Sequence, residues 1–158
     1  MTAYEQLDTF GAFSAARARF DSLQLVLAQP ETAAAHHDVL EDYLLEQGRE
    51  LQRLLMQAHL DVRAARERRR EEVTDTAGVV HHRVEAGHTR TLATVFGKVT
   101  VERMAYRAVG ESNLSPADAV LNLPAHLHYH GLRRLAATEA VRDSFDAALA
   151  RPTTALTA

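Results

Sequence analysis

The chain has 158 residues, 46% of them hydrophobic and 25% charged, which is typical of one globular domain or one domain with a tail. It contains no Cys, which excludes disulfides and thiolate metal sites and fits a reducing compartment. No apolar run approaches the ~20 residues that span a membrane, and the first residues lack the basic and apolar segments of a secretory signal. We therefore expect a cytoplasmic protein without a membrane partner.

The formal net charge of −3 hides an uneven distribution along the chain. Residues 1–60 carry four Arg and nine acidic residues, a local charge of −5. Residues 81–107 carry five Lys or Arg and two acidic residues, a local charge of +3, together with three His. The near-neutral total argues against non-specific binding of nucleic acid by the whole surface, but it allows a local basic patch.

Two helices are predicted in the first 72 residues. Residues 4–28 have apolar residues at helical spacing, and Gln29-Pro30 ends that segment because a residue before proline avoids the α conformation. A second helix is predicted from residues 31–34 to about residue 72, roughly 60 Å long. Its apolar residues fall close to heptad positions, with Gln47 at the one polar step and Gly48 as a weak point; they are Leu40, Leu44, Leu51, Leu54, Ala58, Val62 and Ala65. This pattern predicts a long helical hairpin or coiled coil over residues 1–72.

The end of that helix, RAARERRREE, contains five Arg and three Glu. We interpret it as a solvated helix end, whose cations lie near the negative end of the helix dipole.

The periodicity then changes from helical to two-residue alternation. TDTAG (74–78) predicts a turn, Val79–Glu85 a short strand, and TLATVFGKVTVERMAY (91–106) two strands that turn at Gly97-Lys98. That turn would pair Phe96 with Val99 and put Leu92, Phe96, Val99 and Val101 on one apolar face. Residues 73–110 are therefore expected to form a small antiparallel β-ribbon that packs one face on a helix.

Residues 111–150 are expected to contain two helices. Ser115, Pro116 and Asp118 are typical of a helix start, with an N-cap hydroxyl, proline at the first helical position and an acid in the first turn. A last helix from about His126 to Ala150, with Arg133-Arg134 near its start, could begin a helix-turn-helix. Residues 151–158 have few order-forming signals, so we expect a disordered tail.

No catalytic or metal-binding pattern is found in the sequence, and no cofactor is expected. The acids Glu41, Asp42, Glu46 and Glu50 are closely spaced, but next to Arg residues they more often form a solvated helix face. The alternative, a histidine metal site, would need a larger set to converge, namely His81, His82, His126 and His130.

Basic residues on the ribbon are the best candidates for a direct chemical role, because Lys and Arg on a β-ribbon can contact DNA phosphates. The expected DNA contacts are Arg83, Arg90, Lys98, Arg103 and Arg107, with Arg133 and Arg134 as additional ones. Arg103 lies on the face expected to pack, so an internal ion pair is its alternative role. The alternative for the whole set is that charge keeps an exposed ribbon edge soluble.

Three stretches together resemble the N-terminal region of the Kra-type family of bacterial insertion-sequence transposases, of the DDE class. They are GRELQRLLMQAHLDVRAARE, HTRTLATVFGKVTVERMAYRAVGESNLSPADAVLNLP and YHGLRRLAATEAVRDSFDAAL. The resemblance covers about residues 36 to 149. Its most specific part is R-T-L-x-T-x-F-G-x-V-x-V-x-R-x-x-Y in combination with LNLP and LRRLAA.

The resemblance implies DNA binding and recombination by a longer protein, in which three acidic residues of a later domain hold divalent metal. None of those acids matches a position here, and RPTTALTA (151–158) departs from the family pattern. The expectation is therefore a truncated, non-catalytic DNA-binding fragment of mainly α fold: a long helical hairpin or coiled coil, a small antiparallel ribbon and a C-terminal helix. The alternative function is a coiled-coil interaction module without DNA affinity, which forms a homodimer or pairs with a full-length copy.

Overall fold

The computed structural model describes residues 10–149, and the side chains of residues 10–142. Its helices are α2 (Ser14–Leu27), α3 (Pro30–Ala33), α4 (His37–Ala65), α5 (Pro116–Val120) and α6 (His130–Leu149). Its strands are β1 (Val73–Thr74), β2 (Val80–His81), β3 (Arg83–Thr94) and β4 (Gly97–Arg107). The strands form two antiparallel two-stranded sheets, β1-β2 and β3-β4.

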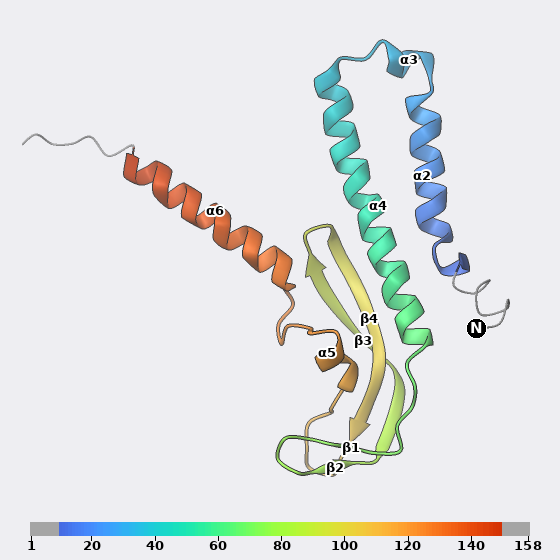
Figure 1. Cartoon of the computed structure of the whole chain (residues 1–158), viewed down its shortest axis with the longest axis vertical. Coiled ribbons are helices and arrows are strands. Elements are labelled where there is room, and N and C mark those ends of the chain that lie inside the picture. Colours follow the sequence, from blue (N-terminus) through green and yellow to red (C-terminus); the bar gives the residue numbers. More distant parts are fainter. Residues whose placement is uncertain (1–9, 150–158) are drawn as a thin grey trace, which may run out of the picture.

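The helices α2 and α4 lie side by side and antiparallel, joined at one end by α3 (Figure 1). The lower half of α4 packs on β4, α5 packs next to it on the same apolar face of the ribbon, and α6 contacts β3 near its start and then extends away (Figure 1). The expected mainly α fold with a long coiled coil is wrong, because about 51% of the chain is helical and 22% is strand, in two small antiparallel sheets. The fold is mixed α and β, with a short helical hairpin.

The long helix is shorter than predicted at both ends. It has 29 residues, begins after the separate α3, and ends at Ala65 instead of about residue 72. The chain beyond it lies along β4, where Glu67 Oε2 accepts the Met104 N–H at 2.8 Å and the Arg70 N–H donates to the Tyr106 hydroxyl at 2.8 Å. Further helical turns of Arg and Glu would bury nothing apolar, whereas the strand edge offers hydrogen-bond partners.

The ribbon buries the expected face in a different register. Leu92, Val99 and Val101 are all buried and form the core with Leu60 of α4. The turn, however, is at Val95-Phe96, so that Leu92 pairs with Val99 instead of Arg103. Gly97 follows this turn with φ +127°, a conformation that L-residues rarely adopt. The predicted turn at Gly97-Lys98 is therefore wrong by two residues. The even shift leaves Leu92, Val99 and Val101 on their expected face, whereas Phe96, which was also expected there, lies in the turn.

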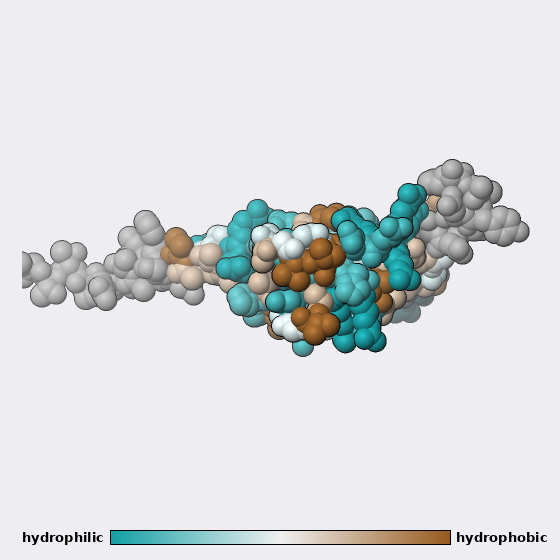
Figure 2. Space-filling model, turned by 90° about the horizontal axis from the view of Figure 1, so that it is seen from below, coloured by the Kyte–Doolittle hydropathy of each residue, from teal (hydrophilic) through white to brown (hydrophobic). Residues whose placement is uncertain are grey.

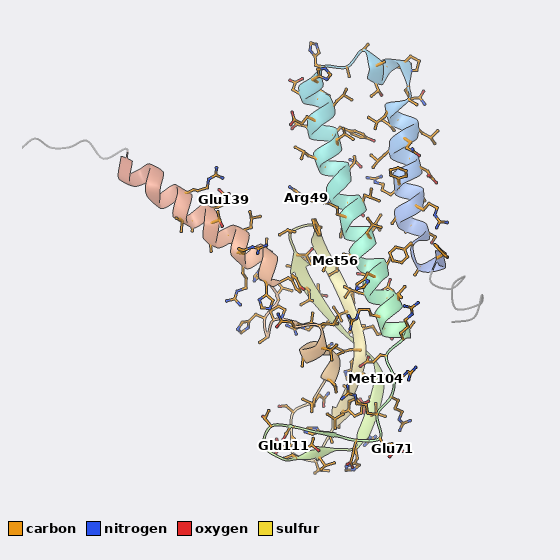
Figure 3. The ribbon with its side chains drawn as sticks, in the orientation of Figure 1. Arg49, Met56, Glu71, Met104, Glu111 and Glu139 are labelled. Carbon is orange, nitrogen blue, oxygen red and sulfur yellow. The ribbon has the colours of Figure 1, made fainter. Side chains whose placement is uncertain are left out.

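The outer edges of the ribbon are covered. On β4, the Gln57 side chain donates to the Thr100 carbonyl at 3.0 Å and accepts the Thr100 N–H at 2.8 Å. On β3, the Ala93 N–H donates to the Leu127 carbonyl at 2.8 Å, and the Tyr129 N–H donates to the Ala93 carbonyl at 2.9 Å. Met56 lies between α4 and the ribbon (Figure 3), against the same core as Leu60. These contacts make the hairpin, ribbon and α5 one packed unit.

The remaining sequence predictions have mixed outcomes. The predicted strand Val79–Glu85 is divided between β2 and the start of β3, while the turn at residues 74–78 is confirmed. The helix start at Ser115-Pro116 is confirmed in position, but the Ser115 hydroxyl makes no capping hydrogen bond. The last helix begins at His130 instead of His126, and the expected tail, 151–158, lies outside the described residues.

Candidate nucleic-acid interface

Two of the basic residues predicted to contact DNA converge on one carboxylate inside the protein. Arg103 Nε lies 2.5 Å from Asp118 Oδ1, and Arg90 Nη1 lies 3.6 Å from Asp118 Oδ2. The side chain of Arg103 is 14% exposed, that of Arg90 20% and that of Asp118 29%. We call this group the Asp118 clasp. It joins both strands of the ribbon to α5 and confirms the internal ion pair considered for Arg103.

The clasp also holds the segment after α5. Arg90 donates to the carbonyl of Pro124 and, at 2.8 Å, to that of His126. Proline at the start of α5 fixes the direction of its first turn, and this turn points Asp118 at the ribbon. Since both guanidinium groups are held by the protein's own acceptors, neither is available to a DNA phosphate without breaking the clasp.

Arg107 has a weaker internal partner. Its Nη2 lies 3.0 Å from Glu85 Oε2, and His88 Nε2 lies 3.1 Å from the same oxygen. The hydrogen bond from His88 and the nearby charges of Arg107 and Arg83 hold the pKa of Glu85 below its ordinary value. Because Arg107 is 44% exposed, it can still present part of its guanidinium group to solvent.

The other four predicted contacts are exposed but do not form one cluster. Lys98 lies next to the turn of the ribbon, Arg83 begins β3 at the opposite end, and Arg133 and Arg134 lie in the first turns of α6. An extended β-strand rises about 3.3 Å per residue, so the two ends of the ribbon are more than 30 Å apart. These residues could contact a long ligand only at separate points.

A basic groove that the sequence analysis interpreted as a solvated helix end is a concave site with a charged rim. It has a volume of about 550 Å³ and lies between the end of α4, β4 and α5. The basic residues that line it are Arg63, Arg66, Arg68 and Arg70. We call it the Arg-lined groove. The sequence signal that could have revealed it is RERRR directly after the last apolar position of α4.

Apolar side chains form the floor of the Arg-lined groove. Leu60, Val101 and Tyr106 are buried there, and Pro116 and Leu121 complete it from α5. The two acids that line it are Glu67, whose Oε2 is engaged by the Met104 N–H, and the exposed Glu102. Four guanidinium groups against two carboxylates give the rim an excess of positive charge, which suits an anionic ligand.

The histidines considered as metal ligands do not converge. His81 is buried with Nδ1 3.2 Å from the Tyr106 carbonyl and Nε2 3.2 Å from Asp75 Oδ2, so both ring nitrogens face protein acceptors. His130 Nε2 lies 3.1 Å from the Asn122 carbonyl. Over the described part of the chain, residues 10–149, no three residues of His, Asp or Glu are grouped in a way that could hold a metal ion.

At the end of the molecule formed by β1 and β2, the surface consists mainly of hydrophilic residues, between which small apolar patches lie apart from one another (Figure 2). None of the described helices is long and apolar enough to cross a membrane.

Comparison with protein-family models, characterised proteins and solved structures finds no match to the chain. The geometry of the site is therefore the main basis for a functional proposal.

Proposed function

We propose that the chain binds the phosphate backbone of duplex DNA through the Arg-lined groove, as the non-catalytic N-terminal module of a transposase that resembles the Kra-type family. The observation that carries the proposal is the set of four Arg on one concave surface. Arg is the side chain best suited to phosphate, because its planar guanidinium group donates in a fork. The proposal is for binding alone.

The proposal moves the main DNA contact from the ribbon to the end of α4. Arg90 and Arg103 are engaged in the Asp118 clasp, so their role is to hold the ribbon against α5. Exposed Lys98, Arg83, Arg133 and Arg134 remain as outer contacts that could position a duplex extending beyond the groove. Contacts of this kind fix orientation and carry little sequence information.

The test is a titration of fluorescently labelled duplex DNA with the full chain, followed by anisotropy over a series of salt concentrations. The groove variant is Arg63→Gln/Arg68→Gln. The matched control is Arg17→Gln/Arg49→Gln, which removes the same charge from exposed positions on the helical hairpin. Arg49 lies well away from Met104 and Glu71, which are close in sequence to groove-lining residues of β4 and of the segment after α4 (Figure 3).

We expect the wild-type affinity to fall steeply as the salt concentration rises. The groove variant should bind more weakly, and its slope of log K against log salt should be smaller in magnitude by about 2, since each lost phosphate contact removes roughly 0.9. The control should keep the wild-type slope. A third variant, Lys98→Gln/Arg83→Gln, tests the ribbon. Absence of binding at low salt, or equal losses in groove and control variants, would contradict the proposal, and a loss confined to the third variant would place the contact on the ribbon.

A further inference from the structure

One side of α2 carries a line of large apolar side chains that contact little of the described protein. Phe13, Phe20 and Leu27 are spaced seven residues apart, so they lie on one line along the helix. Phe20 is 49% exposed and Leu27 40%, while Phe13 is half-buried. The residues of α2 that are buried are Ala16 and Leu23, which lie about 50° around the helix from this line.

A matching line runs along α4. Leu44, Gly48, Leu51, Leu55 and Val62 follow each other at steps of four, three, four and seven residues. Leu44 is 44% and Leu55 43% exposed. Nothing lies within 4 Å of the position that a Cβ on Gly48 would take, so the surface is open and flat there. This line is again offset by about 50° from Ala58, which is one of the two buried residues of α4 and lies about 160° around the helix from the ribbon-facing Leu60.

The two lines lie on the same side of the helical hairpin. Both lines are rotated from the buried positions of their helix in the direction of increasing residue number around the helix axis. When two helices run antiparallel, rotations in this same direction point to the same side of the pair. The opposite side is polar: Arg19 donates to the Gln47 side chain, and Arg53 pairs with Glu50 at 2.7 Å. The ribbon covers a third side, through Met56 and Leu60. The apolar surface formed by the two lines, which we call the hairpin face, is therefore not covered by any element within residues 10–149.

We propose that the hairpin face binds the hairpin face of a second copy of this chain, so that two α2–α4 hairpins form a four-helix bundle. A seven-residue apolar repeat on adjacent helices is the pattern by which helices pack on helices. A two-fold interface uses the same surface on both copies, so Phe20, at the middle of the line from Phe13 to Leu27, would lie near the two-fold axis. Helices of 14 and 29 residues, about 10 Å wide, offer roughly 650 Å², close to the about 800 Å² per partner of a standard interface.

The proposal is independent of DNA binding, since the Arg-lined groove does not include any residue of the hairpin face. It is tested by sedimentation equilibrium of the full chain, without DNA, over a range of concentrations. The face variants are Phe20→Glu and Leu55→Glu. Leu25→Glu is the matched control, because Leu25 is 66% exposed on the far side of α2 and receives the same charge.

We expect a mass of twice 17.5 kDa for the wild type and the control, and a dissociation constant raised at least about a hundredfold in each face variant, because a carboxylate would be buried without a partner. Circular dichroism checks that each variant keeps its helices. A wild type that remains monomeric at the highest concentration overturns the proposal, as does an equal effect of Leu25→Glu.

A second measurement does not depend on a disruptive change. Because the chain contains no Cys, single substitutions Phe20→Cys and Leu25→Cys each provide one unique thiol. A short bismaleimide should link two chains through residue 20 and leave the residue 25 variant unlinked. Linking through residue 25 alone, or through neither, contradicts a dimer formed by the hairpin face.

Discussion

Replacement of Asp118 by Ala should destabilise the protein markedly, because it leaves two partly buried guanidinium groups without their shared carboxylate. Removal of one partner from a buried ion pair costs about 3–5 kcal/mol, and an exposed pair contributes about 0–1 kcal/mol. At 14–29% exposure the clasp lies between these limits, and Arg90 keeps its two carbonyl acceptors. We therefore expect a loss of about 2–3 kcal/mol, which lowers the melting temperature of a chain of this size by roughly 5–10 °C.

The measurement is chemical and thermal denaturation followed by circular dichroism. The matched control is Glu139→Ala, which removes the carboxylate of an exposed pair with Arg142 at 3.2 Å and should leave the midpoint unchanged. Addition of Arg103→Met to Asp118→Ala should recover part of the loss, because the uncompensated charge is removed too. If Asp118→Ala and Glu139→Ala cost the same, or if the second substitution adds a further full loss, the reasoning about the clasp is refuted.

Three further predictions concern the ribbon and its supports. Gln57→Ala should cost about 1 kcal/mol, since it removes both hydrogen bonds between α4 and Thr100 at the edge of β4. Gln52→Ala, an exposed neighbour on α4, should be neutral in urea denaturation. Gly97→Ala should lower the free energy of unfolding by about 1–3 kcal/mol, because φ is +127° and a Cβ would lie 3.1 Å from a side-chain carbon of Arg53. Gly48→Ala, in the open middle of α4, should instead raise the free energy of unfolding of the monomer by about 0.5–1 kcal/mol. Changes of the same sign in the two variants, measured by denaturation, would contradict this reasoning. The pKa of Asp75 lies below its ordinary 3.8 because of hydrogen bonds from the Val79 N–H and then from His81. The stabilising contribution of this carboxylate is therefore present above pH 3.8 and is lost as the pH falls below it. The difference in free energy of unfolding between wild type and Asp75→Ala should shrink from pH 6 to pH 3.

The buried face of the ribbon could be predicted from the sequence, but its register could not. Alternation of apolar and polar residues identifies Leu92, Val99 and Val101 in any register that shifts by an even number of residues. The register depends on where the chain turns, and a glycine is compatible with a turn at its own position or just before it. Here the Thr94 side chain closes the turn by accepting the Phe96 N–H at 3.2 Å and donating to the Gly97 carbonyl at 2.8 Å. A hydroxyl that caps a turn is a weak signal in a sequence rich in Thr.

The end of α4 could not be predicted because helical propensity does not decide it. Arg and Glu are good helix formers, so the sequence favours continuation to about residue 72. The structure ends the helix at Ala65 because the following residues cover the edge of β4. Strand edges that need partners are a property of the folded arrangement, and they are not visible in a local window of sequence.

The same limit applies to the candidate site. An internal ion pair was an open alternative for Arg103, but the sequence does not identify Asp118 as its partner, since Asp118 already has an explanation as the acid in the first turn of a helix. Arg90 was expected to be available to DNA, and the structure instead gives it three protein acceptors. The Arg-lined groove was missed because the same Arg run has a sufficient explanation as a solvated helix end, and only the position of α5 makes it concave.

The residues that carry the resemblance to the transposase family have identifiable roles in the fold. Arg90 and Arg103 form the clasp, Thr94 closes the turn, and Tyr106 is buried with its hydroxyl on the Arg70 N–H. Because these residues maintain the fold, DNA binding needs separate support from residues that the fold does not use. The Arg-lined groove supplies such residues, since Arg63 and Arg68 are exposed. Substitutions in the clasp should therefore lower stability and DNA affinity together, whereas substitutions at Arg63 and Arg68 should lower affinity alone.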